Sequence, residues 1–240
     1  MSVSAISLSD KALRVHRRLA SEYDAPIPFF SQKDPVSQLV SAMLSHRTRN
    51  QDTSQATKQL CEHFPTWQAV IDAPTEEVKE AIAAVNWPEQ KAPRIQQALR
   101  LIAERHHGEL SLDFLADMEP TAAQAWLEEI PGVGPKTSAA VLLFSNLRMP
   151  ALPVDSHHHR VAQRLGLIPE KLGPGPAHKV LRAQLPAGWD AQQLYDNHEI
   201  MMFHGQRVCH YRDPACDDCV ILDLCPTGQM NINIEIDELG

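Results

Sequence analysis

The amino-acid sequence predicts an all-α protein, and three observations support that fold class. Apolar residues recur at helical spacing through most of the 240 residues. No convincing series of alternating strands appears between the turn signals. Proline-rich segments at 150–153 and 169–176 separate the middle of the chain from its C-terminal part, and this length suits one large domain or two small ones.

The first clear helix start lies at Asp34, which is suited to N-capping and is followed by Pro35 and by apolar residues at helical spacing. Thr121, with Gln124 three residues later, predicts a capping box for a helix over 121–129. The segment 230–240 alternates between apolar and polar residues, but one isolated strand cannot form a sheet. Between these points, further helical patterns cover 53–64, 66–72, 75–85 and 90–107.

The composition, 43% apolar and 22% charged, is that of an ordinary globular protein. No N-terminal apolar run resembles a signal peptide, and no apolar stretch reaches membrane-spanning length. We therefore expect a cytoplasmic protein, associated with the nucleoid if the source is bacterial. In that compartment the five cysteines are expected to stay reduced.

The charged residues are unevenly distributed along a chain whose formal net charge is −8. Seven acids and no Lys or Arg follow Arg212, and residues 1–212 carry 22 bases against 23 acids. Between Lys136 and Arg182 there are seven bases and two acids. A locally basic surface on an acidic protein is compatible with nucleic-acid binding, although the net charge alone argues against it.

The segment 131–134, PGVG, joins two predicted helices in a tight turn. Gly132 and Gly134 permit positive φ and leave backbone N–H groups, including that of Val133, unshielded beside a helix N-terminus, where an anion is favoured. Such a helix–hairpin–helix grips a DNA phosphate without reading sequence. A simple glycine-containing turn between two packed helices is the alternative, and the spacing alone does not decide between them.

Lys136 begins the helix that follows this turn, where the helix dipole disfavours an ammonium group. Most lysines are solvated surface charges, but a neutral amine is a nucleophile suited to forming a Schiff base with a sugar carbon. Asp155 follows the proline-rich break and can assist proton transfer or stabilise positive charge on a sugar. Its alternative role is to N-cap a helix beginning at Ser156, and the two roles are compatible.

Four cysteines lie within 17 residues in a C-x6-C-x2-C-x5-C pattern: Cys209, Cys216, Cys219 and Cys225. Four thiolates this close in a reduced compartment are typical metal ligands. The spacing lacks the paired knuckles of common zinc ribbons and differs from ferredoxin runs, so the pattern predicts a four-thiolate site and leaves the metal open. Cys61 stands apart beside Leu60, and we expect it to be buried.

In combination, these motifs resemble the endonuclease III family of DNA glycosylases, which carries a helix–hairpin–helix and a Gly/Pro–Asp signature. LEEIPGVGPKTSAAVL resembles the family hairpin, whose catalytic lysine falls on Lys136. VDSHHHRV resembles the segment with the catalytic aspartate, which falls on Asp155. The cysteine spacing resembles the family's [4Fe–4S] loop, which makes the four cysteines the ligands of that cluster. The resemblance runs in one collinear order from about residue 20 to residue 226.

The resemblance implies two helical domains with DNA bound between them: a six-helix domain over 35–149, and a cluster domain formed by 1–34 together with 150–240. It also implies excision of oxidised pyrimidines, such as thymine glycol, from double-stranded DNA, followed by β-elimination at the abasic site. Adenine-excising relatives lack a lysine at the position of Lys136, so this residue implies a bifunctional glycosylase and abasic-site lyase. We expect a monomer, because such an enzyme needs no partner subunit.

Some positions depart from the family pattern. LSHRTRN has Arg47 where relatives have a glutamine that fills the gap left by the extruded base, and VNWPEQKA has Trp87 where they have a leucine wedge. We expect both side chains to contact DNA, with a core or domain-interface aromatic as the alternative for Trp87. Further DNA contacts are expected from His157, which fits a family position, and from Arg207 and Arg212 near the cysteine loop.

His158 and His159 follow His157 on the predicted helix, where consecutive side chains point in different directions and cannot all bind one metal ion. We expect these two at the surface or in the DNA groove. The altered wedge residues leave a second hypothesis open, a catalytically weak DNA-binding or damage-sensing relative. A third, an iron–sulfur electron carrier, is disfavoured by the hairpin and by the lack of a second redox motif.

Overall fold

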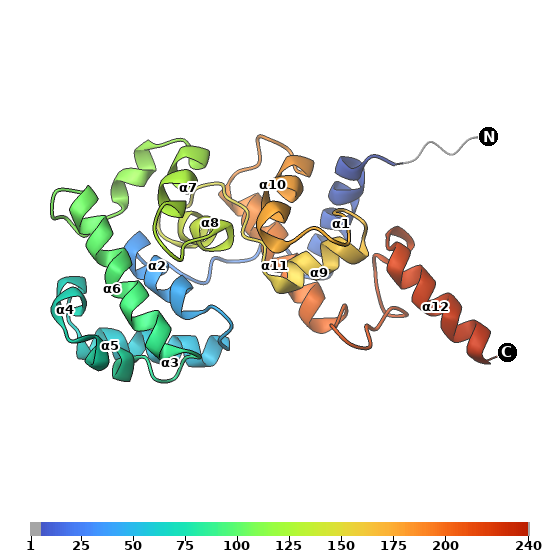
Figure 1. Ribbon diagram of the computed structural model, residues 1–240. Coiled ribbons are helices and arrows are strands. Elements are labelled where there is room, and N and C mark those ends of the chain that lie inside the picture. Colours follow the sequence, from blue (N-terminus) through green and yellow to red (C-terminus); the bar gives the residue numbers. More distant parts are fainter. Residues whose placement is uncertain (1–5, 240) are drawn as a thin grey trace. The chain divides into compact units, whose positions relative to one another are not determined.

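The computed structural model describes residues 6 to 239, and every regular element within them is a helix, which confirms the all-α prediction. The chain divides into two compact units (Figure 1). The first, which we call the hairpin unit, is Phe30–Ala151; the second, the cluster unit, joins the chain up to Phe29 to the chain from Leu152 onward. The assignment of a six-helix domain to 35–149 stays a prediction.

The hairpin unit begins at the helix start expected from the sequence. Asp34 Oδ1 accepts a hydrogen bond of 2.9 Å from Ser37 N, and Pro35 occupies the first turn. The elements that follow are α2 (Pro35–Leu44), α3 (Asn50–His63), α4 (Trp67–Asp72), α5 (Thr75–Ala81), α6 (Pro88–Arg105), the 3-10 turn η1 (Asp113–Asp117), α7 (Pro120–Glu128) and α8 (Pro135–Phe144).

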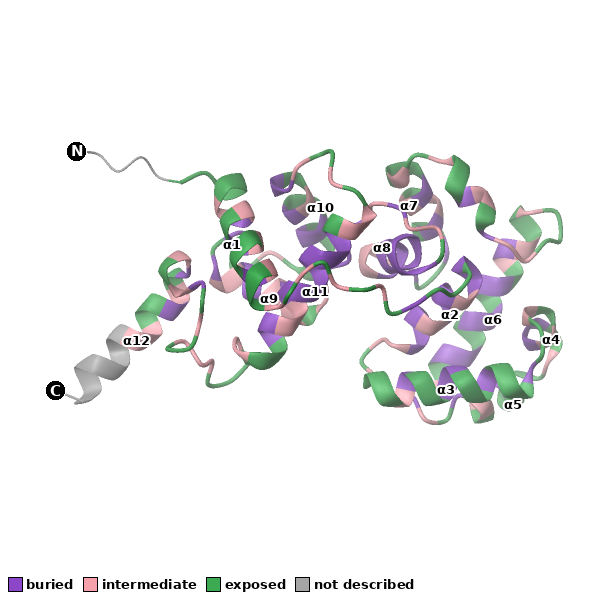
Figure 2. Cartoon of the chain, turned by 180° about the vertical axis from the view of Figure 1, so that it is seen from behind, coloured by how far each residue is buried: buried purple, intermediate pink, exposed green. Residues whose placement is uncertain are grey.

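The core of the hairpin unit forms around α8. Every residue of this helix from Thr137 to Phe144 is buried, and Figure 2 shows it as the most continuously buried helix of the unit. A helix that is apolar on all sides is stable only when neighbours surround it. α2 and α7 pack against it, and α6 closes the same core with Ile95, Leu99 and Ile102. Only its first turn, with Pro135 and Lys136, stays half-exposed.

The capping box predicted for α7 does not form. The helix starts one residue earlier, with Pro120 at its first position and Glu119 as an N-cap that makes no side-chain hydrogen bond. Thr121 therefore already lies inside the helix, and Gln124 donates to Glu128 Oε1 at 3.1 Å instead of reaching back. The fixed φ of proline is suited to a first helical position, and it overrides the Thr–Gln pattern.

The cluster unit contains α1 (Leu8–Glu22), α9 (Ser156–Arg164), α10 (Pro174–Gln184), α11 (Ala191–Arg207), the 3-10 turn η2 (Leu222–Leu224) and α12 (Pro226–Leu239). α9 and α1 both pack against α11. The α9–α11 contact requires a glycine, because a Cβ at Gly205 would come within 2.8 Å of His157 Cβ. α11 thereby becomes the buried axis of the unit, and its middle turn carries the polar residues Asp196, Asn197, His198 and Glu199.

Two further sequence expectations need correction or completion. Cys61 is exposed, because α3 buries Ala56 and Leu60 on one face and the next residue along turns outward. The alternating segment 230–239 continues helix α12, so its period of two does not mark a strand. In the described part of the chain, no helix is both long and apolar enough to cross a bilayer.

Candidate functional site

The turn between α7 and α8 has the backbone geometry of a tight hairpin. Gly132 has φ +86°, a conformation that favours glycine, whereas Gly134 has φ −106° and acts as the N-cap of α8. The sequence-based reason for Gly134, positive φ, is therefore wrong. A Cβ added at Gly134 would meet no atom within 4 Å, so its lack of a side chain leaves open space in front of the helix N-terminus.

Val133 faces the other way from this open space. Its side chain is buried in the core of the hairpin unit, and its N–H donates to Ile130 O at 3.0 Å. The two helices are joined a second time by Ser138 Oγ, which donates to Glu128 Oε1 at 2.8 Å. The buried Val133 side chain and the Ser138–Glu128 hydrogen bond thus fix the inner side of the turn. Its outer face is formed by glycine backbone.

Lys136 occupies the second position of α8, beside His46, which follows the end of α2. His46 Nε2 lies 2.8 Å from Thr137 Oγ1. Burial, followed by the positive charges of Lys136, Lys91 and Arg94, lowers the pKa of His46 to about 4. The His46 imidazole is therefore neutral at physiological pH, within a cluster of three cations around the hairpin.

Lys91 is a buried cation that organises the segment after α2. Its Nζ donates to Leu44 O at 2.6 Å, to His46 O at 2.9 Å and to Thr48 Oγ1 at 2.8 Å. It thereby satisfies carbonyls at the C-terminal end of a helix, where positive charge is favoured. Burial lowers the pKa of Lys91 to about 8. Sequence reasoning missed this role, because a lysine on a helix is usually solvated.

We expect Lys91→Met to lower the free energy of unfolding by about 2–3 kcal/mol, because it leaves the Leu44 and His46 carbonyls without their buried donor. Urea unfolding followed by circular dichroism measures this difference. Lys58→Met, at a lysine whose side chain is 75% exposed, is the matched control and should change stability by less than about 0.5 kcal/mol. Equal stability of the two variants would show that Lys91 is not structural.

Arg47 and Trp87 are brought together in strained backbone. Both have positive φ, +49° and +56°, a region that costs about 1–2 kcal/mol for residues with a Cβ. Asn86 Nδ2 donates to Arg47 O at 2.5 Å, and the Arg47 guanidinium carbon lies 6.0 Å from the Trp87 ring centroid. Trp87 is 43% exposed, which excludes a core aromatic. Strain that persists at exposed residues is typical of functional sites.

In the cluster unit, Asp155 is the N-cap of α9, and its Oδ1 accepts a 2.7 Å hydrogen bond from His158 N. Burial pushes the pKa of Asp155 upward, but His198, the His158 N–H and the His158 and His157 rings outweigh burial and hold the pKa below its usual range. The capping role considered from the sequence is therefore present in the structure, and the carboxylate is ionised at neutral pH.

Two buried histidines fix the segment that leads into Asp155. His178 of α10 accepts from Val154 N through Nε2 at 3.0 Å, and His198 of α11 donates from Nδ1 to Pro153 O at 2.9 Å. The backbone before Asp155 is held from both sides as a result. No pattern in the sequence distinguished these two histidines from surface residues.

The three consecutive histidines have different surroundings. His158 is 2% exposed, so its expected surface position is wrong: its side of α9 turns into the unit. Burial, followed by His198, lowers the pKa of His158 to about 3, and its Nδ1 has no partner in the described structure. His157 is half-buried, with Nδ1 3.1 Å from Arg160 Nη2, and His159 Nε2 lies 2.9 Å from Leu172 O.

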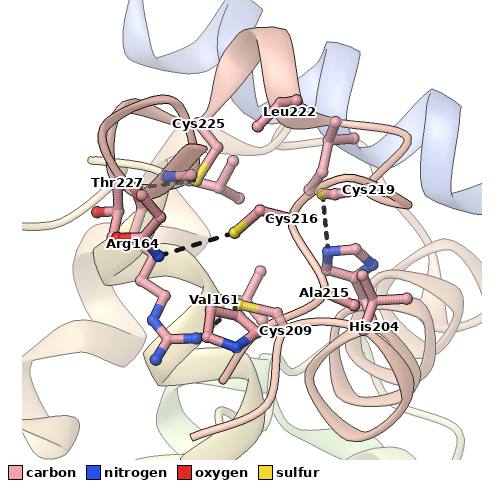
Figure 3. Close-up of a pocket in the computed structure, with 16 residues that line it drawn as sticks. Val161, Arg164, His204, Cys209, Ala215, Cys216, Cys219, Leu222, Cys225 and Thr227 are labelled. Atoms are coloured by element: carbon pink, nitrogen blue, oxygen red, sulfur yellow. Dashed lines mark hydrogen bonds between the residues drawn. The ribbon is translucent and has the colours of Figure 1, made fainter. Parts of the chain in front are cut away.

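The four clustered cysteines line one cavity of the cluster unit (Figure 3). Each sulfur has a polar neighbour: Arg164 Nη1 at 3.2 Å from Cys209, Asn231 Nδ2 at 3.8 Å from Cys216, His204 Nε2 at 3.5 Å from Cys219 and Gly228 N at 3.3 Å from Cys225. Burial raises the pKa of the Cys219 thiol to about 11 and also raises that of Cys225. Metal binding at this site would therefore release protons.

The arrangement of the thiols bears on the kind of metal group they can hold. In the described part of the chain, no three Cys, His, Asp or Glu side chains lie close enough together to hold one metal ion. The sulfurs instead border a shared cavity, with N–H donors suited to thiolates around it. This donor set fits a group of several atoms ligated by four cysteines.

The loop that begins at Cys209 is held by hydrogen bonds from two arginines of α9. Arg160 Nη2 donates to Gly205 O at 2.6 Å and to Cys209 O at 3.0 Å. Arg164 donates to His210 O at 2.6 Å and to Tyr211 O at 3.0 Å. Both arginines were missed as structural residues, although their spacing of four on a predicted helix places them on one face.

Arg207 and Arg212, the two arginines of the cluster unit that we expect to contact DNA, are both exposed. The guanidinium carbon of Arg207 lies 4.6 Å from the Phe203 ring centroid and 5.4 Å from that of Tyr23. These two cation–π contacts hold the Arg207 guanidinium at a defined place on the surface. Arg212 belongs to the loop that Arg164 supports.

Comparison with known proteins gives concordant matches. The HhH-GPD model, described as a superfamily of base excision DNA repair proteins, matches residues 40–187. An endonuclease III of Thermotoga maritima is 32% identical over 81% of this chain and 84% of its own. The endonuclease III of Escherichia coli K12 is 30% identical over 90% of this chain and 94% of its own.

Solved structures resemble the fold. A non-covalent endonuclease III–DNA complex has a TM-score of 0.79 at 24% identity and covers 95% of this chain and 100% of that one. A thermostable thymine-DNA glycosylase has a TM-score of 0.71 at 19% identity, with 92% and 97% covered. At these identities the likeness concerns the fold alone.

Proposed function

The chain belongs to the HhH-GPD superfamily of base excision DNA repair proteins, and on that basis we propose that it is a bifunctional DNA glycosylase and abasic-site lyase of the endonuclease III type. Its substrate would be double-stranded DNA containing oxidised pyrimidines such as thymine glycol. The observation that supports this most is Lys136 in the half-exposed first turn of the otherwise buried helix α8, directly after the glycine turn.

The chemistry requires the damaged nucleotide to leave the base stack, because no side chain reaches C1′ within a duplex. The Lys136 amine then forms a bond to C1′ while the bond from C1′ to the base breaks. Asp155, ionised and held by the His158 N–H, stabilises the positive charge that develops on the sugar. The amine then loses a proton and the C1′–O4′ bond of the sugar ring opens, which gives a protonated Schiff base. Loss of the C2′ proton from it breaks the C3′–O bond, releases the 3′ phosphate as the leaving group and cleaves the strand.

The DNA contacts follow from the exposed groups around the hairpin. The turn at Gly132 and Gly134 presents backbone to a phosphate at the N-terminus of α8. Arg47 and Trp87, held together in strained backbone, would fill the space left by the extruded nucleotide and stack on its neighbours. His157, Arg207 and Arg212 are proposed as contacts from the cluster unit. The Val133 side chain is in the core and its N–H donates to Ile130 O, so Val133 supports the turn that presents the glycine backbone.

We propose a [4Fe–4S] cluster ligated by Cys209, Cys216, Cys219 and Cys225, which line the shared cavity. Such a cluster supplies no step in base excision. When bound, it ties together η2, the start of α12 and the loop that Arg160 and Arg164 hold. Its role is therefore to order the loop that carries Arg212.

Borohydride trapping tests this function directly. Duplexes containing thymine glycol, or an abasic site, are incubated with the protein and reduced. We expect a covalent adduct on both, because each reaction passes through the same Schiff base. An adduct on the abasic duplex alone would point to a different lesion. No adduct on either, with DNA binding retained, would favour the catalytically weak DNA-binding relative.

Replacement of Asp155 can separate its two roles. Asp155→Asn keeps an N-cap as good as the original, so we expect the free energy of unfolding to change by less than about 0.5 kcal/mol. Excision of the base should nevertheless slow by about a hundredfold, because the carboxylate charge is gone. Asp155→Ala should lose the same activity and about 1 kcal/mol of stability in addition. If Asp155→Asn excises the base at the wild-type rate, Asp155 acts only as the N-cap of α9.

A further inference from the structure

Asn86 makes polar contacts that the proposed function does not use. It is exposed, and it lies in the segment between α5 and α6, directly before Trp87. Asn86 Nδ2 donates to Arg47 O at 2.5 Å, and the backbone N–H of Asn86 donates to Thr48 Oγ1 at 3.3 Å. The segment before α6 is therefore joined by its side chain and by its backbone to the segment that follows α2.

Thr48 is the point at which this connection reaches the core of the hairpin unit. Its hydroxyl accepts from Asn86 N and, at 2.8 Å, from Lys91 Nζ, and it donates to His46 O at 3.2 Å. A hydroxyl has one donor and two acceptor positions, so all three are used. Lys91, which is 6% exposed, also donates to His46 O at 2.9 Å. A buried cation thus fixes the segment after α2, and Asn86 fastens the segment before α6 to it.

Arg47 and Trp87 lie on the two sides of this connection. Both have positive φ, and the Arg47 guanidinium carbon is 6.0 Å from the centroid of the Trp87 ring, a cation–π contact. A residue with a Cβ keeps such a backbone conformation only where the surrounding contacts determine it. Asn86 supplies a contact of this kind for both residues, because its side chain is bonded to the carbonyl of Arg47 and its backbone directly precedes Trp87.

We propose that Asn86 is a positioning residue that assembles the Arg47–Trp87 pair before DNA is bound, and that the assembled pair raises the preference of the protein for DNA with a vacated base position over intact duplex. The inference rests on the proposed function, in which the pair fills the space left by the extruded nucleotide. Side chains that are fixed in advance lose little conformational freedom on binding, so more of their stacking energy appears as affinity. In an intact duplex that space is occupied, and the same pair gains nothing.

The first experiment measures binding and needs no catalysis. Fluorescence anisotropy gives the dissociation constants for an undamaged duplex and for the same duplex with one tetrahydrofuran abasic analogue, and their ratio is the preference for the vacated position. Asn86→Ala should lower the wild-type preference about three- to tenfold, the effect of one lost hydrogen bond. Asn86→Asp keeps the size of the side chain but cannot donate to Arg47 O, so we expect at least the same loss. An unchanged preference in these variants would overturn the proposal.

Two controls show whether Asn86 acts through the pair. Asn146→Ala removes an exposed asparagine of the same unit, in the loop after α8, and should leave the preference unchanged. Asn86→Ala is also made in protein that already carries Arg47→Met and Trp87→Ala, where no pair remains to be positioned. There we expect less than about a twofold further change. A full further loss in that background would show that Asn86 acts by another route and would overturn the proposal.

A second measurement uses the protein without DNA. Fluorine NMR of protein labelled with 5-fluorotryptophan resolves its four tryptophans, and Trp87→Phe identifies the signal of Trp87. Arg47→Met takes the guanidinium away from the ring and should shift this signal when Asn86 is present. In Asn86→Ala, where the pair is not assembled, the same change should shift it much less. Equal shifts in the two backgrounds would overturn the proposal, whatever the direct effect of Asn86→Ala on the neighbouring ring.

The two measurements separate failure of the inference from failure of the proposed function. If the shifts differ but wild type does not prefer the abasic duplex, the proposed function fails together with the role of the pair in it, whereas the assembly of the pair by Asn86 stands. If wild type prefers the abasic duplex and Asn86→Ala prefers it equally, the inference fails and the proposed function stands.

Discussion

Lys136→Gln is expected to abolish borohydride trapping and to lower strand cleavage at an abasic site by at least about a thousandfold. The amide of glutamine has no nucleophilic lone pair with which to attack C1′, so the covalent route is lost. The fold should persist, because Lys136 is half-exposed in the first turn and glutamine has nearly the same helix propensity. The hairpin backbone and the cations Lys91 and Arg94 remain, so DNA binding should weaken only slightly.

The experiment combines trapping, strand cleavage and fluorescence anisotropy on the same abasic duplex. Lys58→Gln removes an equal charge from an exposed position of α3 and should trap like wild type. This control separates loss of the amine from loss of one positive charge. An adduct formed by Lys136→Gln at the wild-type level would contradict the assignment and would direct attention to Lys91, the other lysine around the hairpin.

Those features of the fold that depend on local sequence were predictable. The all-α class follows from helical periodicity, and the start of α2 follows from Asp34 and Pro35, whose hydrogen bond and position the structure confirms. Failures arose where two local signals competed or where only packing decides. Pro120 overrode the Thr121 capping pattern, and a period of two in 230–239 gave way to helix α12.

The candidate site shows the same division. Residues within a motif, such as Lys136 and the four cysteines, could be named from the sequence because their spacing is itself the signal. The groups that tune them could not be named. Lys91, His178 and His198 acquire their roles through burial against distant segments, and a lone polar residue on a helix gives no sign of that. His158 failed for this reason: its surroundings come from α10 and α11, far along the chain.

Cys219→Ala is expected to remove the proposed iron–sulfur cluster and to lower the melting temperature by about 10 °C. Four thiolate ligands hold such a cluster, so the loss of one leaves an open iron that is readily lost. Between Cys209 and the start of α12 at Pro226, the described structure has only the three-residue turn η2 as a regular element, so this segment depends on the arginines of α9 and on the cysteine site. A loss of a few kcal/mol in a chain of this size corresponds to a shift of that order.

Iron and acid-labile sulfide content, melting temperature and limited proteolysis between Cys209 and Cys225 measure this effect. Cys61→Ala is the matched control: this cysteine is exposed on α3 in the hairpin unit, so its loss should leave iron, sulfide and stability unchanged. Because the proposed cluster takes no part in the proposed chemistry, we expect any excision that remains in Cys219→Ala still to give a borohydride adduct through Lys136. Zinc without sulfide in the wild-type protein would refute the iron–sulfur assignment, whereas a cluster that persists in Cys219→Ala would remove that thiol from the ligand set.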